Sequence, residues 1–358
     1  MIKFDKNKPY NDLPLLPGIF EYDQKEFLKL AIKASEEVGK LNGLIKLIPN
    51  FEILISPFLI KESVKSNEIE NINTTTIKVL QQDAINTKNV SGPEKEVLSY
   101  RDSMLAGYKL LREQKGIGYN LLMLLQSNIE PSKPGVRKIS GTVISNSLGE
   151  VLYTPPSGEE NINRLLTNLE KFINNFEDDI DAFIKMPIIH YQFEAIHPFL
   201  DGNGRTGRIL NILHLVLAGK LDYPILFLSE YINRTKTDYY RLLNKTTETG
   251  DYTDFTIYLL KGIILQAKNT SNRIIQIKEL IINVENKMSS LNIDYHKITT
   301  ILFSKPYQTL SSFEKEMGVS RATANRYIDK LEKKGVISSV KIGKNKLIYI
   351  SEFIDLIS

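Results

Sequence analysis

The sequence predicts a mainly α-helical protein with one β-hairpin and a small C-terminal domain of the winged helix-turn-helix type. Apolar residues recur at three- and four-residue spacing along most of the 358-residue chain, which is the period of helices packed on one face. The segment from Val136 to Tyr153 alternates instead, which is typical of a hairpin. Residues 309–350 read as two short helices followed by a second hairpin.

Composition limits the classes of protein to consider. Hydrophobic residues make up 42% and charged residues 25% of the chain, as in ordinary globular proteins, and the length allows two or three domains. The absence of cysteine excludes disulfides and thiolate metal sites and fits a reducing compartment. Charges interrupt the N-terminus, and the longest apolar run, residues 209–219, is too short to span a bilayer. We expect a soluble, cytoplasmic protein with no membrane partner.

The helical pattern is strongest in five segments. These are residues 26–48, 60–72, 94–113, 161–176 and 254–288. The hairpin carries its turn residues at Asn146–Gly149, and Pro155 with Pro156 ends it. A single hairpin in a helical body is either a lid or recognition edge or a plain connection, and the pattern does not choose between them.

The C-terminal segment is basic. Between Lys305 and Ile350 there are ten Lys and Arg residues against four Asp and Glu, whereas the net charge of the whole chain is only +4. Gly318 marks a tight turn and Ser320 the N-cap of the second helix. The residues predicted to face a DNA groove or to lie on the wing are Arg321, Thr323, Asn325, Arg326, Lys341, Lys344 and Lys346. Winged helices also dimerise or dock on proteins, so DNA stays one of several partners.

The segment "HPFLDGNGRTGR", residues 197–208, concentrates the polar chemistry of the chain. We expect a helix that starts with Pro187 in its first turn and ends near His197, because Pro198 cannot continue it. A second helix is predicted to begin close to Arg205 and to run to Leu217. The intervening loop therefore leads into a helix N-terminus, where free N–H groups and the helix dipole favour an anion.

The side chains around that N-terminus suit a polyphosphate. Gly202 and Gly204 let the backbone approach phosphate oxygens without a Cβ in the way. Arg205 and Arg208 are three residues apart, so both guanidinium groups can project from one side of the helix.

Asp201 and His197 complete the predicted chemistry. Asp201 lies where Mg²⁺ could join its carboxylate to phosphate oxygens. His197 can accept a proton at neutral pH, or it merely caps its helix. His190 and His214 lie in apolar helical patterns and His296 in the expected linker, so these three are predicted to be structural or solvated.

With every defining position filled, the segment resembles the signature of the Fic family, H-P-F-x-[D/E]-G-N-G-R-x-x-R. The resemblance extends to "FDKNKPYNDLPLLPG" near the N-terminus, to "GVRKISGTVI" and "YTPPS" of the hairpin, and to "SEYINRTKTDYYRLL" after the motif. It implies a Fic-type helical bundle with a flap at about 137–154. The expected domains are 1–110, 111–275 and 276–358.

The resemblance also implies an activity and its residues. The expected reaction is transfer of AMP from ATP to a Tyr, Thr or Ser hydroxyl of a protein held on the flap. Mg²⁺ on Asp201 would assist, and His197 would be the base. Asn203 with the amides of Gly202 and Gly204 would receive the α-phosphate. Arg205 and Arg208 would hold the leaving pyrophosphate, and Tyr239 with Tyr240 would line the adenine and ribose site.

An upstream motif resembles the inhibitory sequence of the same family, [S/T]-x-x-x-E-[G/N]. It is "SNEIEN", residues 66–71, within the helix expected at about 60–72. Ser66, Glu70 and Asn71 fill its defining positions. The resemblance implies that Glu70 competes with the γ-phosphate of ATP for Arg208.

Two functions of different classes remain open at this point. The first is a protein adenylyltransferase that also modifies itself. The second is a DNA-binding regulator whose Fic body only senses nucleotide. Removal of AMP from a modified protein, assisted by Glu70, is a subsidiary alternative, and a homodimer is left open.

Overall fold

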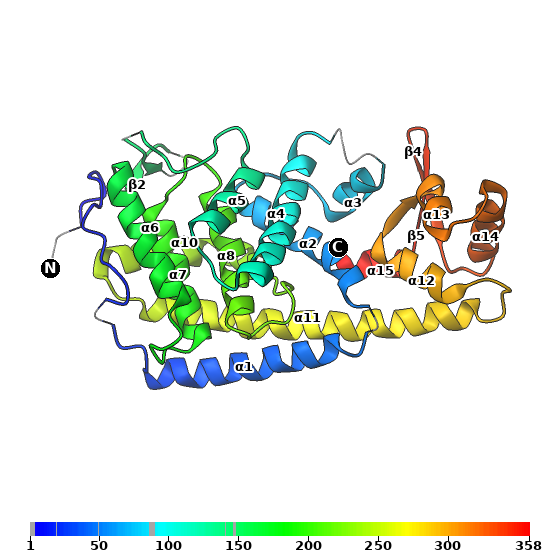
Figure 1. Ribbon diagram of the computed structural model, residues 1–358, viewed down its shortest axis with the longest axis horizontal. Coiled ribbons are helices and arrows are strands. Elements are labelled where there is room, and N and C mark those ends of the chain that lie inside the picture. Colours follow the sequence, from blue (N-terminus) through cyan, green and yellow to red (C-terminus); the bar gives the residue numbers. More distant parts are fainter. Residues whose placement is uncertain (1–3, 19, 49, 86–89, 140, 146–147) are drawn as a thin grey trace. The chain divides into compact units, whose positions relative to one another are not determined.

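The computed structural model describes residues 4–18, 20–48, 50–85, 90–139, 141–145 and 148–358. Within these residues the chain is mainly helical, with two small antiparallel sheets, so the predicted fold class is confirmed (Figure 1). The chain divides into two compact units. The first comprises Met1–Gly39 and Asp102–Lys268, and the second comprises Lys40–Arg101 and Asn269–Ser358.

The first unit holds the motif segment. Its elements are α1 (Lys25–Ile45) up to residue 39, α4 (Pro93–Gln114) from residue 102, α5 (Tyr119–Ile129), β1 (Ile144–Ser145), β2 (Val151–Tyr153), α6 (Glu159–Asn174), α7 (Ala182–Ile196), α8 (Asn203–Leu217), α9 (Leu228–Arg234), α10 (Lys236–Thr249) and α11 (Thr253–Met288) up to residue 268.

Helix α7 forms the centre of the first unit. Almost every residue of α7 is buried, which matches its apolar sequence on all sides. Helices α6 and α8 pack against it (Figure 1). The helix begins at Ala182, so the prediction that Pro187 lies in its first turn is wrong. Asp181 caps the helix by accepting a hydrogen bond from the Phe183 N–H at 2.8 Å, and Pro187 lies in the helix interior.

The predicted hairpin is present but short. Ile144 pairs with Tyr153 and Ser145 with Val151, with an irregular register between them. Of the predicted turn residues, 146 and 147 lie outside the described part of the chain. The N-terminal segment lies beside the end of β2, since Tyr10 N–H donates to Thr154 O at 3.0 Å and Thr154 Oγ1 donates to Lys6 O at 2.6 Å. This pairing joins two segments that resemble the Fic family.

The second unit combines the inhibitory-motif helix with the C-terminal module. Its elements are the C-terminal end of α1, α2 (Glu52–Ile69), α3 (Thr76–Ile85), the N-terminal part of α4, the C-terminal part of α11, α12 (Tyr295–Ser304), β3 (Tyr307–Thr309), α13 (Leu310–Met317), α14 (Arg321–Lys333), β4 (Ser338–Ile342), β5 (Asn345–Tyr349) and α15 (Ser351–Ile357).

The order of elements in the C-terminal module is compatible with the predicted winged helix. Gly318, with φ of +68°, ends α13, and the Ser320 side chain caps α14 by accepting from the Thr323 N–H, as predicted. The sheet has the order β3-β5-β4, and β4 with β5 forms the wing. His296 is not in a linker: it lies in the first turn of α12, which Asp294 caps, and its Nδ1 is 3.1 Å from Glu285.

The five helical segments predicted from the sequence are all helical, as α1, α2, α4, α6 and α11, although α2 ends at Ile69, before residue 72. No helix in the described ranges is both long and apolar enough to cross a membrane.

Candidate active site

The motif loop turns through two residues in the left-handed conformation. His197 follows the last residue of α7 with φ of +47°, and Gly202 precedes the first residue of α8 with φ of +82°. Glycine reaches this conformation without strain, whereas histidine does so at a cost that the surrounding structure must offset. The predicted loop leading into a helix N-terminus is therefore present between Pro198 and Asn203.

Arg137 holds His197 in place. Its Nε donates to His197 O at 2.7 Å, and its backbone N–H donates to Pro198 O at 2.9 Å. Its Nη2 donates to Pro156 O and, at 3.3 Å, to Ile196 O. The side chain is buried, and burial lowers the pKa of its guanidinium below the ordinary value. Arg137 therefore fixes the backbone that carries the predicted base.

Tyr153 of β2 makes a second connection to the same helix end. Its hydroxyl donates to Ala195 O at 2.7 Å. The hairpin is thus joined to the last turn of α7, two residues before His197.

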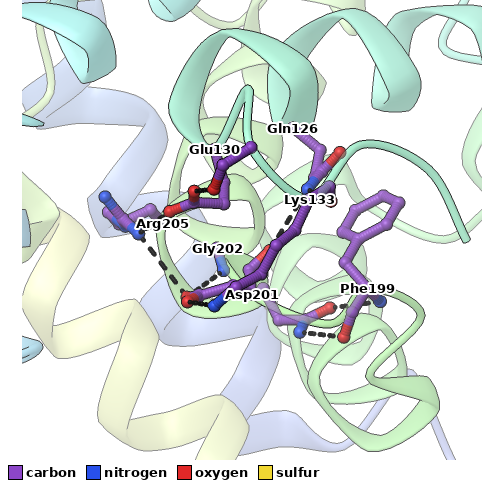
Figure 2. A network of polar contacts seen from close by, with 9 residues as sticks. Gln126, Glu130, Lys133, Phe199, Asp201, Gly202 and Arg205 are labelled. Atoms are coloured by element: carbon purple, nitrogen blue, oxygen red, sulfur yellow. Dashed lines mark hydrogen bonds and ion pairs between the residues drawn. The ribbon is translucent and has the colours of Figure 1, made fainter. Parts of the chain in front are cut away.

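Asp201 presents a half-exposed carboxylate beside α8. Its Oδ1 accepts from the Gly202 N–H at 2.7 Å, and its Oδ2 accepts from Lys133 Nζ at 3.0 Å (Figure 2). Partial burial raises the pKa of Asp201, but the hydrogen bonds from Lys133 and Gly202 and the positive charges of Lys133 and Arg205 outweigh it. The net pKa is lowered, so the carboxylate is ionised at neutral pH.

A buried glutamine joins the neighbouring loop to the backbone of Asp201. Gln126 of α5 donates through Nε2 to Lys133 O at 2.8 Å and to Asp201 O at 3.4 Å. Its Oε1 accepts from the Gly135 N–H at 3.0 Å. Figure 2 shows Gln126 and Lys133 on one side of Asp201. One amide side chain therefore connects α5, the loop at 130–135 and the motif loop.

The two predicted phosphate arginines are both buried but have different neighbours. Arg205 Nη2 lies 3.7 Å from Asp201 Oδ1 and 4.0 Å from Glu130 Oε2 (Figure 2). Arg208 lies close enough to His190 of α7 for its charge to lower the pKa of that histidine. The two guanidinium groups thus have different neighbours: carboxylates beside Arg205 and a neutral imidazole beside Arg208.

Asn203 and Gly202 both make hydrogen bonds within the motif loop. Asn203 Oδ1 accepts from the Phe199 N–H at 2.9 Å, and its Nδ2 donates to Phe199 O at 2.8 Å (Figure 2). The Gly202 N–H is directed at Asp201 rather than away from the loop. The Asn203 side chain therefore closes the loop, and the Gly202 amide orients the carboxylate.

The residues expected at the adenine site divide into a buried and an accessible one. Tyr239 is only 2% exposed, and its hydroxyl lies 2.8 Å from His190 Nε2. The neighbouring Tyr240 is 40% exposed. Tyr239 is therefore buried and contacts His190, whereas the ring of Tyr240 is accessible to solvent.

His190 and His214 are structural, as predicted. Both are fully buried, and burial is the main cause that lowers the pKa of each to about 3. The positive charges of Arg208 and Lys185 lower these pKa values further. Neither imidazole is charged at neutral pH.

The inhibitory motif lies in the second unit. Ser66 is a buried residue of α2, and Glu70 is the C-cap residue that follows the helix. Asn71 adopts φ of +62°, and the next amide, Ile72 N–H, donates back to Asn67 O at 3.0 Å. This is a helix-ending motif that requires a left-handed residue, which explains in physical terms why Gly or Asn suits the last position of the motif.

Four residues that contact the motif loop or the end of α7 were not predicted from the sequence: Gln126, Lys133, Arg137 and Tyr153. Gln126 interrupts an otherwise apolar helix, "YNLLMLLQSNI", and that is the one signal that could have identified it. Within the described residues, no group of three or more His, Asp or Glu side chains could hold a metal by itself.

Three family models match the chain in succession. They are the Fic/DOC family N-terminal model at residues 28–109, the Fic/DOC family model at 122–215, and the C-terminal domain of the SoFic-like protein adenylyltransferase at 278–353. The site described above falls largely within the second match.

Similar proteins carry related names. A probable protein adenylyltransferase of Aquifex aeolicus is 42% identical over 79 residues, covering 22% of this chain and 23% of that protein. A protein adenylyltransferase Fic of Nematostella vectensis is 26% identical over 215 residues, covering 55% of this chain and 45% of that protein. The chain thus spans less than half the length of these curated relatives.

A crystal structure of a Fic family protein from Desulfovibrio desulfuricans has the same fold. It superimposes with a TM-score of 0.57 at 18% identity, covering 92% of this chain and 97% of that one. Because the three family models follow one another along most of the sequence and the fold agrees, the chain belongs to the Fic/DOC family.

Proposed function

We propose that this protein is an adenylyltransferase that transfers AMP from ATP to a Tyr, Thr or Ser hydroxyl of a protein. The observation that carries the proposal is the motif loop itself. It holds an imidazole, an ionised carboxylate and a helix N-terminus within seven residues, His197 to Asn203, and Arg137 fixes the base from outside the loop. The names of the similar proteins support the same activity.

His197 is the general base in this proposal. Its ring accepts the proton of the incoming hydroxyl while the hydroxyl oxygen bonds to the α-phosphorus and the bond to the β-phosphate oxygen breaks. Pyrophosphate leaves with that electron pair. The fixed left-handed backbone of His197 supplies the positioning on which such catalysis depends.

Asp201 fits the Mg²⁺ that this chemistry uses. Mg²⁺ binds proteins through one or two carboxylates and completes its shell with water and phosphate oxygens, and Asp201 is an ionised, half-exposed carboxylate. When bound, the cation would neutralise charge on the phosphates. Lys133 and Gly202 orient the carboxylate that would hold it.

The phosphates of ATP would lie at the N-terminus of α8. The backbone amides of Gly204 and Arg205 and the guanidinium groups of Arg205 and Arg208 supply the positive charge there. Asn203 contributes by closing the loop, and the exposed ring of Tyr240 is the surface proposed for the adenine.

A protein substrate would pair with the hairpin. Strands β1 and β2 have the dimensions of a short edge to which an extended segment can add. The same edge could receive a segment of another copy of the chain, which is the proposed route to self-modification.

Incubation with α-labelled ATP and a divalent cation tests the activity. Label should enter protein in the wild type and be absent in His197→Ala, with Arg164→Ala as an exposed arginine control in the same unit. Loss of label from a pre-modified protein in the same assay would favour AMP removal. If no protein in a lysate of the source cells is labelled by wild type or by a Glu70→Gly variant, the proposal is wrong.

Glu70 is proposed as the inhibitory residue, acting on Arg208. Glu70→Gly should raise auto-modification, because Arg208 then stays available to the γ-phosphate. Arg208→Ala should remain inactive even in combination with Glu70→Gly. A helix-end glycine that acted only on stability would lower activity instead. Unchanged labelling in Glu70→Gly on every substrate, including itself, would remove Glu70 from regulation.

DNA binding by the winged helix is the second candidate function. Lys341 pairs directly with Lys346 across the wing, a like-charge pair that destabilises a hairpin unless an anion lies nearby. Glu332 of α14 neutralises Lys346 at 3.0 Å, while Arg321 and Arg326 of α14 are exposed. Anisotropy of a labelled duplex should show salt-dependent binding that Lys341→Glu weakens. Absence of binding at low salt excludes this function.

A further inference from the structure

The carboxylate of Asp201 already has a cation beside it. Lys133 Nζ donates to Asp201 Oδ2 at 3.0 Å, while Oδ1 accepts from the Gly202 N–H at 2.7 Å. The two charged side chains are 50% and 43% exposed. An incoming divalent cation would therefore bind Oδ2, and the ammonium group of Lys133 already lies against that oxygen.

The position of Lys133 is imposed by its backbone. Residues 130–133 form a turn, closed by the Lys133 N–H donating to Glu130 O at 3.2 Å, with Pro131 at its second position. Gln126, which is fully buried, then holds Lys133 O at 2.8 Å and the Gly135 N–H at 3.0 Å. Because the same Nε2 reaches Asp201 O at 3.4 Å, the lysine and the aspartate are held by one side chain (Figure 2).

We propose that the ammonium group of Lys133 occupies the position of the divalent cation on Asp201. Its positive charge weakens binding of the metal ion alone, and it leaves Asp201 when metal and nucleotide bind together. The inference rests on the proposed function for the identity of the metal and the nucleotide. It assigns a positioning role to a residue outside the motif.

The charges of the pair fit this role. Lys133 Nζ forms a salt bridge with Asp201 Oδ2 at 3.0 Å, so one positive charge already lies against the carboxylate. An ammonium donates through three rotatable N–H groups, and it can therefore exchange a carboxylate for a phosphate oxygen without leaving the site. Among the described residues, no group of three or more acidic or histidine side chains could hold a metal ion. A metal ion without nucleotide therefore has no further set of protein ligands to offset the charge of Lys133.

Mn²⁺ binding without nucleotide tests the proposal directly. Free Mn²⁺ is measured by electron paramagnetic resonance during titration of wild type and Lys133→Met, a variant that keeps the length of the side chain and loses its charge. Removal of one positive charge next to a divalent site, at the dielectric constant of water and physiological salt, should tighten Mn²⁺ binding about five-fold. Lys138→Met is the matched control, because Lys138 Nζ pairs with Glu159 at 3.2 Å instead.

Two further variants separate this role from a structural one. Lys133→Arg retains the charge and should bind Mn²⁺ as weakly as wild type. In an Asp201→Asn background, Lys133→Met should no longer tighten Mn²⁺ binding. If Lys133→Met binds Mn²⁺ no more tightly than wild type while Lys138→Met and wild type agree, the proposal is overturned. Since the titration requires no AMP transfer, tightened Mn²⁺ binding in a protein that labels no substrate would overturn the proposed function and support the role of Lys133.

Discussion

Replacement of Arg137 by alanine should reduce both the stability of the first unit and the rate of AMP transfer. The Arg137 side chain donates to three carbonyl oxygens, those of His197 at 2.7 Å, Ile196 at 3.3 Å and Pro156. A buried acceptor that loses its donor costs about 1–3 kcal/mol. We therefore expect a loss of about 3 kcal/mol in the free energy of unfolding, with water satisfying part of the demand.

The effect on the rate follows from His197. Its backbone, at φ of +47°, is in a conformation that costs about 1–3 kcal/mol and persists only while its surroundings enforce it. Without Arg137 the imidazole is free to shift, and a displacement of about 1 Å can cost ~10²-fold in rate. The KM for ATP should change little, because Arg137 contacts the base and not the predicted phosphate site.

Single-turnover transfer from labelled ATP and thermal unfolding followed by circular dichroism measure the two effects. Arg137→Lys should recover stability in part but not the rate, since an ammonium cannot span the carbonyls that the fork reaches. Arg164→Ala, which removes an exposed contact to Asn161, should change neither quantity. A folded Arg137→Ala protein that transfers AMP at the wild-type rate would refute the reasoning.

Four other outcomes are expected. His197→Ala should lower transfer ~10²–10⁴-fold with ATP binding retained, as equilibrium dialysis can verify. Asp201→Ala should weaken Mg²⁺-dependent ATP binding and transfer together, and unchanged activity in excess chelator would contradict this. Asn71→Gly should preserve thermal stability while Asn71→Val lowers it by about 1 kcal/mol or more, because only the former accepts the left-handed conformation. Because the pKa values of His190 and His214 are lowered to about 3, the unfolded state binds more protons than the folded state below pH ~6.5. Each histidine should therefore lower the free energy of unfolding by up to about 1.4 kcal/mol per pH unit as the pH falls toward 3, which denaturant titrations at several pH values can measure.

The sequence was sufficient to predict the five long helical segments, the hairpin and the motif loop, because each depends on local patterns, whereas α3, α5 and α12 were not predicted. The apolar period defines α11, and Gly318 with Ser320 marks the turn between α13 and α14. Pro187 was misleading, since a proline is equally consistent with a first turn and with a buried helix interior whose cap lies further upstream.

The supports of the site were not predictable, because they join segments far apart in the chain. Arg137 reaches a carbonyl 60 residues away and Lys133 a carboxylate 68 residues away. The spacing of residues within one segment does not indicate contacts between segments this far apart. Likewise, Tyr239 and Tyr240 are adjacent in sequence, and only the packing of α10 decides which ring is buried.

Gly207 illustrates what close helix packing implies for the geometry of the site. A Cβ at Gly207 would meet the carboxylate end of the Glu194 side chain and would lie 3.1 Å from the Phe193 ring, so α8 packs closely against α7 at this position. The helix that ends at His197 and the helix that begins at the anion site are therefore in close contact at Gly207, and a larger residue there would have to displace the Glu194 side chain or the Phe193 ring. A side chain at position 207 should therefore shift the end of α7 that carries His197 relative to the N-terminus of α8, so the size of this one residue is linked to the geometry of the candidate active site.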